Sequence, residues 1–456
     1  MRILLFLLFA STTLVGQTND QDPKYTVAQL REDFTFFRIK METKHPNFYL
    51  YTSKEVLDKK LDELYSSITK PMTGTEFYRH IASIQQYIKD GHNYLLPGKD
   101  QLNFYANNAR YFPLDFVLFD SKLFVTKNLS RDSSIMIGDE ICTINGENAL
   151  AIFNRMVEYQ VRDGINLQYP KYITQTFFRS YYGFFFGFKD FYEAELKNLS
   201  GVKRVVKIEG VPFKEIKNKR DSSPPLRYDR TQFSKGVFWE FNPGKNYTLL
   251  TIKTWNNDLL KSDYRQHFKK EIKTFLLELK KNNPGNLIID LRGNQGGDGK
   301  NGILLLKHLL PHSFRYFYSV KKLNSHHKLK NTSRNLTKEH KPSDYIFQGQ
   351  VYVLTNGGSF SNSGIFSSLI KIHKRGKIIG EETGGNGVIL TGGDNNYEFP
   401  NTKINLFKAT DQMIVSNQIK NTGEGVKPDI EIKPDLNSIL NNEDLVLKKA
   451  IELCKK

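Results

Sequence analysis

Apolar residues recur at helical spacing through the first hundred residues of the chain. The first helix is predicted to end at Pro46, and the same spacing returns over 56–64 and 75–88. We therefore predict a helical N-terminal region over 17–105. The apolar positions that define the first helix are Leu30, Phe34, Phe37 and Met41.

The next region, 106–212, changes to short strands and tight turns. Apolar runs at 114–119 and 123–126 flank a short polar turn and predict a hairpin, and Asn145-Gly146 is a strong turn-forming pair. Together with the stretch 137–146, this pattern resembles a PDZ module, which binds extended peptide ends by strand addition. The alternative is a structural β-domain without a ligand.

Strands and helices alternate after a polar linker predicted at 213–246. Such alternation predicts βαβ units with right-handed crossovers, and it makes 247–456 an α/β core. Chemistry in such sheets gathers at the carboxyl ends of the strands. The predicted strands are 248–253, 286–290, 351–355 and 377–380, and the predicted helices are 259–281, 300–310 and 362–374.

Two strand ends in this core are rich in small residues. The stretch 290–297 ends on glycines that can offer bare backbone N–H groups, and the stretch 351–364 ends on a cluster of serines before a helix. A carbonyl held between them would meet a nucleophile on one side and an oxyanion pocket on the other. This pattern predicts a serine hydrolase, with Ser361 as the first candidate nucleophile.

The chain has 456 residues and a formal charge of +18, spread along its length. Because no nucleic-acid-binding module is recognisable, we predict solvated surface rather than nucleic-acid binding. The segment 319–348 is a long basic loop, for which we favour a mobile flap or disorder.

The N-terminus is typical of a cleaved secretory signal. A short basic start precedes an apolar run, and 1–16 is predicted to be removed near Gly16. No later segment is apolar enough over the length of a membrane helix, so we predict a periplasmic or secreted protein without stable membrane insertion. The only cysteines, Cys142 and Cys454, do not suggest a disulfide framework.

Four motifs occur in the order seen in the tail-specific, or C-terminal processing, serine peptidases. The stretches 45–49 and 90–95 resemble the branch of that family nearer the tricorn protease core and the retinoid-binding repeat proteins. The resemblance implies a multidomain α/β protein with a ClpP/crotonase-like catalytic core, a PDZ-like β-domain and a helical N-terminal region. The four motifs are 290–297, 354–364, 379–385 and 425–430.

This resemblance implies that Ser361 is the nucleophile. It also implies that the N–H of Asn362 and an N–H from the glycine-rich turn, best matched by Gly296, form the oxyanion hole. A serine before a helix is also a common N-cap, a role compatible with catalysis. Ser359 and Ser363 are the neighbouring alternatives.

The general base departs from the family's usual lysine. The matching position holds Asn386, which cannot act as a base, and Lys371 and Lys377 do not fall at that position. The tricorn-like branch uses an upstream histidine, which points to His92, and imidazole can take the proton of a serine hydroxyl near neutral pH. Weaker candidates are His45, which is expected to pack at the end of the first helix, and His80; Asp90 is a candidate to orient His92.

The third member of the relay stays open. The tricorn-like branch has a glutamate where this chain has Thr422, so Glu424 and Glu382 are alternatives, each against a surface role. No metal site or cofactor is predicted, because the histidines are scattered and the pair His326-His327 lacks spaced partners. The glycine turn also lacks the Lys-Ser/Thr ending of a phosphate-binding loop.

We therefore expect an exported serine endopeptidase that acts on unfolded proteins or on C-terminal protein segments. The rival hypotheses are a non-catalytic ligand- or peptide-binding protein on the same fold, and a Ser–Lys protease that uses a non-standard lysine.

Overall fold

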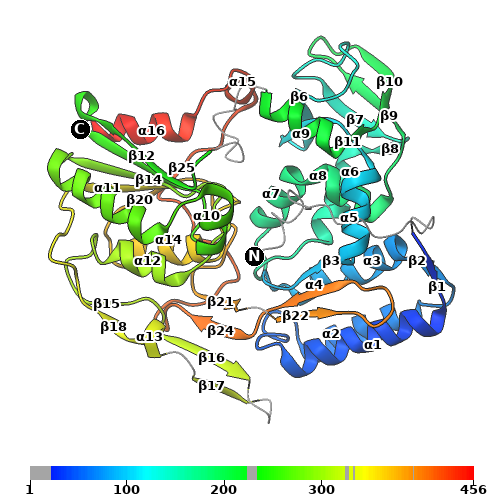
Figure 1. Cartoon of the computed structure of the whole chain (residues 1–456), viewed down its shortest axis with the longest axis horizontal. Coiled ribbons are helices and arrows are strands. Elements are labelled where there is room, and N and C mark those ends of the chain that lie inside the picture. Colours follow the sequence, from blue (N-terminus) through cyan, green and yellow to red (C-terminus); the bar gives the residue numbers. More distant parts are fainter. Residues whose placement is uncertain (1–21, 223–233, 324–327, 332–333, 394, 456) are drawn as a thin grey trace. The chain divides into compact units, whose positions relative to one another are not determined.

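The computed structural model describes residues 22–222, 234–323, 328–331, 334–393 and 395–455 (Figure 1). The predicted signal peptide and the pair His326-His327 lie outside the described residues. The chain forms two compact units, each built from separate stretches of sequence. Of the described residues, unit 1 holds 22–161, 173–222 and 395–409, and unit 2 holds the others.

Unit 1 contains most of the helices predicted for the N-terminal region and the antiparallel sheet that follows them. Its helices are α1 (Val27–Lys44), α2 (Lys54–Ser66), α3 (Gly74–Ala82), α4 (Gln85–Ile88), α5 (Lys99–Asn108), α6 (Ala149–Glu158), α8 (Phe178–Phe186) and α9 (Phe213–Ser222). Its strands are β1 (Lys24–Tyr25), β2 (Met72–Thr73), β3 (Tyr94–Leu96), β4 (Arg110–Tyr111), β5 (Leu114–Phe119), β6 (Lys122–Asn128), β7 (Glu140–Ile144), β8 (Glu147–Asn148), β9 (Phe191–Lys197), β10 (Lys203–Glu209), β11 (Val211–Pro212), β22 (Asn395–Glu398) and β23 (Asn405–Lys408).

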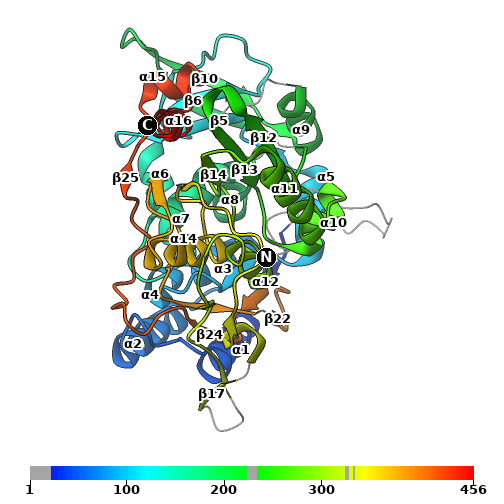
Figure 2. The ribbon, with the colours of Figure 1, turned by 90° about the vertical axis from the view of Figure 1, so that its left-hand side faces the viewer.

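The first helix shows why the apolar pattern was informative. Thr26 and Gln29 form a capping box at the start of α1, which satisfies backbone N–H groups that have no partner inside the helix. The four apolar positions predicted from the spacing are all buried, and α1 packs beside α2 (Figure 2). The predicted helix and its buried face are confirmed.

The larger sheet of unit 1 is antiparallel, in the order β10-β9-β7-β6-β5, with β8 paired to β7. The predicted hairpin is β5 and β6, and Asn145-Gly146 turns the chain between β7 and β8. A smaller sheet joins distant parts of the chain, because β3 pairs with β23, which in turn pairs with β22.

Unit 2 is an α/β domain. Its helices are α10 (Asn257–Tyr264), α11 (Phe268–Asn282), α12 (Gly299–Leu306), α13 (Arg334–Thr337), α14 (Asn362–Ile372), α15 (Leu436–Leu440) and α16 (Leu445–Cys454), and α7 (Gln168–Thr176) begins in this unit. Its strands are β12 (Val237–Asn242), β13 (Tyr247–Ile252), β14 (Asn286–Asp290), β15 (Phe314–Arg315), β16 (Ser319–Leu323), β17 (Leu329–Asn331), β18 (Glu339–His340), β19 (Gln350–Thr355), β20 (Lys377–Gly380), β21 (Ile389–Gly392), β24 (Asp411–Ile414) and β25 (Ile430–Glu431).

The central sheet of unit 2 has the order β12-β13-β14-β19-β20-β25, and all neighbours are parallel except β12 and β13. Side chains alternate between its two faces. Leu250 and Ile289 join the core with α11, α12 and α14, whereas Leu249 and Ile288 join the core with α16. Figure 1 shows α16, in red, on the face opposite to α11, α12 and α14. This three-layer arrangement confirms the predicted α/β class.

The predicted helix 259–281 is two helices, α10 and α11. Arg265 ends α10 in the left-handed conformation, with a φ of 53°. The next residue, Gln266, accepts the backbone N–H groups of Gly236 and Val237 through its side-chain oxygen, at 2.7 and 3.0 Å. The chain breaks here because this side chain serves a neighbouring strand, which helical periodicity does not reveal.

The predicted loop 319–348 contains short regular elements, so the prediction of a structureless segment was wrong for its described residues. β16 pairs with β17 and also with β24, where Ser319 lies opposite Ile414. Its partner comes much later in the chain, and local sequence patterns cannot show such a pairing. The predicted linker likewise begins with α9 and contains β12, which is the edge strand of the central sheet.

Two further expectations concern cysteines and membranes. Cys142 and Cys454 are both free thiols. Among the helices of the described residues, none is both long and apolar enough to cross a bilayer.

Candidate active site

Ser361 lies in a sharp turn between β19 and α14. It is the N-cap residue of α14 and has a φ of 53° and a ψ of −117°, a conformation that is strained for a residue with a Cβ atom. Its side chain makes no capping hydrogen bond with the first turn of the helix. The N-cap alternative therefore does not account for its hydroxyl group. A strained strand-to-helix turn of this kind exposes the nucleophilic serine of α/β-hydrolases.

Burial separates the three serines of this turn. Ser359 and Ser363 are fully buried, whereas Ser361 is partly exposed. The Ser359 hydroxyl donates to the carbonyl of Leu291, at 2.8 Å. The Ser363 hydroxyl donates to the carbonyl of Asn294, at 2.8 Å, and accepts the indole N–H of the buried Trp255. These hydrogen bonds tie the turn to its neighbours and leave Ser361 as the serine that a substrate can reach.

Adjacent strand ends bring the glycine-rich turn to this serine. β14 and β19 are parallel neighbours, with Asp290 opposite Leu354, so both strands end at the same edge of the sheet. The turns that follow are also joined, because Gly293 N–H donates to the Asn356 side chain and Phe360 N–H donates to the carbonyl of Asn294.

Gly296 and Asn362 both lie against Ser361. A Cβ atom added to Gly296 would lie 2.6 Å from the Cβ of Ser361 and 2.9 Å from the backbone nitrogen of Asn362, so only glycine fits here. Asn362 is the first residue of α14, and the backbone N–H groups of a first helical turn have no partner inside the helix. Three of the four predicted site residues are therefore brought together.

Two details of this arrangement were not predicted. The backbone N–H of Gly296 donates to the side-chain oxygen of Asn294, at 2.9 Å, so this donor already has an acceptor within its own turn. The buried side chain of Asn362 is held at both ends, by the Tyr316 hydroxyl and by the carbonyl of Asp298. The Asn362 side chain is thereby directed away from catalysis and into the support of the turn.

Asn386, at the position of the family lysine, has a structural role. Its neighbour Gly385 packs against the backbone nitrogen of Ser361, where an added Cβ atom would lie 2.6 Å away. The buried Asn386 side chain donates to the Asn421 side chain at 2.7 Å and accepts the N–H of Val388 at 2.8 Å. This side chain organises the turn and offers no base.

The two alternative lysines also have other surroundings. Lys371 donates to the carbonyl of Lys427 at 2.7 Å and pairs with Asp429 at 3.0 Å. Lys377 is an exposed residue at the start of β20. The surroundings of neither lysine favour a Ser–Lys pair.

The two candidate carboxylates differ in what they contact. Glu382 accepts the backbone N–H of Gly425 at 2.7 Å and thereby supports a neighbouring turn. Glu424 pairs with Lys427 at 2.8 Å, and the hydrogen bond from this lysine lowers the pKa of Glu424. Both carboxylates have structural contacts of their own.

Sequence reasoning missed one segment of this site, residues 162–172. Tyr169 stacks on Phe360, the residue before Ser361, with ring centroids 3.9 Å apart, and its hydroxyl donates to the Gln295 side chain at 3.1 Å. Asp163 accepts the backbone N–H of Asn386 at 3.1 Å. The segment comes from the range assigned to the PDZ-like domain, and the available sign was the long aromatic stretch 160–192.

His92, the fourth predicted site residue, belongs to unit 1. It follows α4 and precedes β3, and its backbone N–H donates to the Asp90 carboxylate at 2.9 Å. Burial lowers the pKa of His92 to about 4, and the charge of Asp90 opposes this shift. Burial alone would raise the pKa of Asp90. The neighbouring His45 and His92 have the larger opposite effect and hold the pKa of this carboxyl below its usual value.

The other two candidate histidines have packing roles. His45 is buried and is the C-cap residue of α1, as predicted. His80 lies 3.0 Å from the carbonyl of Leu64 through Nε2 and stacks on Phe77.

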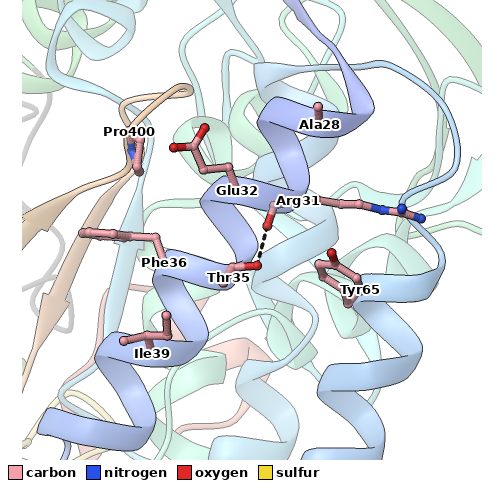
Figure 3. A pocket seen from close by; sticks show the side chains of 8 residues that line it. All are labelled: Ala28, Arg31, Glu32, Thr35, Phe36, Ile39, Tyr65 and Pro400. Atoms are coloured by element: carbon pink, nitrogen blue, oxygen red, sulfur yellow. Dashed lines mark hydrogen bonds between the residues drawn. The ribbon is translucent and has the colours of Figure 1, made fainter.

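Unit 1 also has a surface pocket of about 550 Å³ beside α1 (Figure 3). Its walls include Arg31, Phe36 and Tyr65, and the Thr35 hydroxyl donates to the carbonyl of Arg31 at 2.8 Å. None of the predicted site residues lines this pocket, so we do not assign it to the active site.

Comparisons with known proteins concern the sequence family and the fold. Residues 246–432 match the family model of peptidase family S41. No curated protein sequence matches the chain. A solved structure of mature CPAF has a TM-score of 0.68 and 14% identity, covering 94% of this chain and 97% of that chain. A structure of mature CPAF complexed with lactacystin has the same TM-score and identity, over 94% and 98% of the two chains.

At 14% identity these structures establish a shared fold, whereas the family model concerns the sequence that contains Gly296, Ser361 and Asn362. The sequence similarity to peptidase family S41, a family of serine-type peptidases, therefore extends over residues 246–432 of this chain.

Proposed function

We propose that the chain is an exported serine endopeptidase in which Ser361 attacks the scissile carbonyl and His92 takes the proton of its hydroxyl. The observation that carries the proposal is the serine turn. Ser361 is strained and partly exposed, and it lies against Gly296 and the first backbone N–H of α14.

The proposed reaction uses the groups of this turn together with His92. The Ser361 oxygen bonds to the carbonyl carbon as His92 accepts the hydroxyl proton, and the carbonyl oxygen becomes an oxyanion. We assign its stabilisation to the N–H groups of Asn362 and Gly296, with Gly296 exchanging Asn294 for the oxyanion. His92 then gives its proton to the leaving amine, and water hydrolyses the acyl-enzyme.

The histidine assignment rests on the family resemblance and on the state of the ring. A pKa of about 4 leaves the imidazole unprotonated at neutral pH, as a proton acceptor must be. Asn386 cannot replace it, because amides do not accept protons at neutral pH and this one is engaged in the turn.

The test is covalent labelling with a fluorophosphonate, followed by mass spectrometry of the peptides. We expect the adduct on Ser361, no adduct in Ser361→Ala, and at least about a hundredfold slower labelling in His92→Ala. His80→Gln is the matched control, because it changes a histidine of the same unit that packs at a helix. An adduct on another serine would refute the nucleophile, and unchanged labelling in His92→Ala would refute the base.

The same experiment separates the rival functions. A wild-type protein that does not label but binds an apolar ligand or a peptide tightly would be a binding protein on this fold. Labelling that survives in His92→Ala and is lost in Lys371→Ala would establish a Ser–Lys protease.

For the substrate, we propose an unfolded protein segment or an extended C-terminal peptide that pairs with the antiparallel sheet of unit 1. The support is the PDZ-like sequence pattern and a sheet that has edge strands β5 and β10. Fluorescence anisotropy with one peptide, in free-acid and amidated forms, tests this. Equal affinity for the two forms would contradict recognition of a C-terminal carboxylate.

Export is proposed from the signal-like N-terminus, and the expected mature protein begins at Gln17. N-terminal sequencing of the protein recovered from the periplasm or medium tests it. Recovery of the whole chain in the cytoplasm, with Met1 retained, would contradict it.

A further inference from the structure

Three polar side chains of unit 1 are almost completely buried at the loop that carries His92. The exposed fractions of His45, Asp90 and Asn93 are 3%, 3% and 0%. Burying polar groups costs free energy unless they contact one another, and a buried carboxylate needs partners most. The cluster joins the end of α1 to the segment between α4 and β3, from parts of the chain that are distant in sequence.

The hydrogen bonds of His45 determine where its ring proton lies. The backbone N–H of Asn47 donates to Nδ1 of His45 at 3.1 Å, so Nδ1 holds a lone pair. The proton of the ring is therefore on Nε2. This nitrogen faces the Asn93 side chain at 2.7 Å and Oδ2 of Asp90 at 3.7 Å.

The Asn93 side chain can accept the Nε2–H of His45 when its oxygen, rather than its nitrogen, faces the ring. The Nε2–H of His45 is a donor and so is the amide nitrogen of Asn93, whereas Oδ1 of Asn93 has no hydrogen-bond partner among the described residues. A half-turn of the amide exchanges the two atoms, and Oδ1 then accepts the proton of His45. The backbone carbonyl of Asn93 is held by the Gln85 side chain at 2.8 Å, which keeps this residue in place.

The Asp90 carboxylate lies between the two histidines. Oδ1 accepts the backbone N–H of His92 at 2.9 Å, and Oδ2 faces the protonated nitrogen of His45. A carboxylate fixed in this way sets the conformation of the residue two positions later. Its charge also acts on the His92 imidazole.

We propose that His45 and Asn93 are positioning residues, which hold the Asp90 carboxylate in place and through it orient His92. His45 thus has a role beyond packing at the end of α1. The inference rests on the proposed function, in which His92 is the general base, but its central contacts lie within unit 1.

Two substitutions of one residue test the proposal. In His45→Gln, the longer amide places its nitrogen near the position of Nε2 and keeps a donor toward Asn93 and Asp90. In His45→Asn, the shorter amide reaches only the position of Nδ1, so the acceptor for Asn47 is kept and the contact with Asp90 is lost. Both variants replace the same buried ring with an amide, so they share the cost of the lost ring.

We expect His45→Asn to slow fluorophosphonate labelling of Ser361 about tenfold, because the Asp90 carboxylate loses its electrostatic contact with Nε2 of His45. His45→Gln should stay within about threefold of the wild type, and His80→Gln should not differ from it. Equal losses in the two His45 variants would overturn the proposal, because they would show a packing role.

A double-mutant cycle shows whether His45 acts through Asp90. If it does, His45→Asn combined with Asp90→Asn should label no more slowly than Asp90→Asn alone, since the contact is already lost. Multiplicative losses would overturn the proposal. Should His45→Asn fail to fold, Asn93→Ala replaces it in the same cycle.

A second readout does not depend on catalysis. In protein with ¹³C-labelled histidine, the ring signal of His92 is identified by its loss in His92→Gln. We expect this signal to shift in His45→Asn and to stay near its wild-type position in His45→Gln. If the wild type does not label, the proposed function fails while this measurement still decides the inference. An unchanged His92 signal in His45→Asn would overturn it.

Discussion

At the serine turn of unit 2, the backbone holds the functional groups, whereas at the His92 loop of unit 1 buried side chains do so. Ser361 is placed by a strained φ and by glycines that allow close approach. His92 follows the Asp90 carboxylate, which faces His45, and His45 in turn contacts the Asn93 side chain. We therefore expect added atoms to disrupt the serine turn, whereas the removal of side-chain contacts should disrupt the His92 loop.

The largest effect is expected from adding one methyl group to the serine turn. In Gly296→Ala the new Cβ atom meets the Cβ of Ser361 at 2.6 Å, and a displacement of the nucleophile by about 1 Å can slow a reaction a hundredfold. We therefore expect labelling of Ser361 to slow about a hundredfold.

Gly146→Ala is the matched control for this substitution. Gly146 also has a positive φ, of 78°, but an added Cβ atom would meet nothing within 4 Å. The substitution Gly146→Ala therefore has the cost of a positive φ in a residue with a Cβ atom, but not the cost of a close contact. If both variants label like the wild type, the turn does not depend on close packing.

The second largest effect is expected on the free energy of unfolding, which should depend on pH through His92. The pKa of His92 is about 4 in the folded chain, where burial lowers it against the charge of Asp90, and about 6.5 when unfolded. Between these values the unfolded chain binds a proton that the folded chain does not. The free energy of unfolding should therefore fall as the pH drops from 6.5 toward 4, by up to about 3 kcal/mol, and the contribution is complete above pH 6.5.

Urea unfolding at pH 7 and at pH 4.5 measures this difference. His92→Gln should show a smaller loss of stability on acidification than the wild type, because glutamine does not titrate. An equal loss in the two proteins would show that His92 is not the group responsible.

A smaller effect is expected at Asn386, where a side chain supports the serine turn. Asn386→Ala removes hydrogen bonds to Asn421 and to the backbone N–H of Val388, and leaves the latter, partly buried donor without this acceptor. We expect the free energy of unfolding to fall by about 2 kcal/mol. Urea unfolding measures it, with the exposed Asn396→Ala as control; a loss no greater than that of the control would contradict the structural role.

The smallest effect is expected at Glu424, which pairs with Lys427 near the surface. Glu424→Gln should label within about twofold of the wild type, because exposed ion pairs contribute little. A loss of tenfold or more in the labelling rate would instead identify Glu424 as the third member of the relay.

Much of this molecule follows from local sequence patterns. Helical spacing predicted the buried face of α1, and alternating strands and helices predicted the central sheet of unit 2. The small residues after β14 and β19 marked the strand ends that meet at Ser361. These predictions succeed because side-chain periodicity, capping and turn preferences act between residues that are close in sequence.

Tertiary structure decided which of these groups can act. Burial separated Ser361 from Ser359 and Ser363, and the segment 162–172 supplied Tyr169 to the serine turn. The contact of His45 with Asp90 and the pairing of β16 with β24 join residues that are far apart in the chain. Solvent exposure, pKa shifts and such pairings depend on what the folded chain brings together, and local sequence patterns do not contain that information.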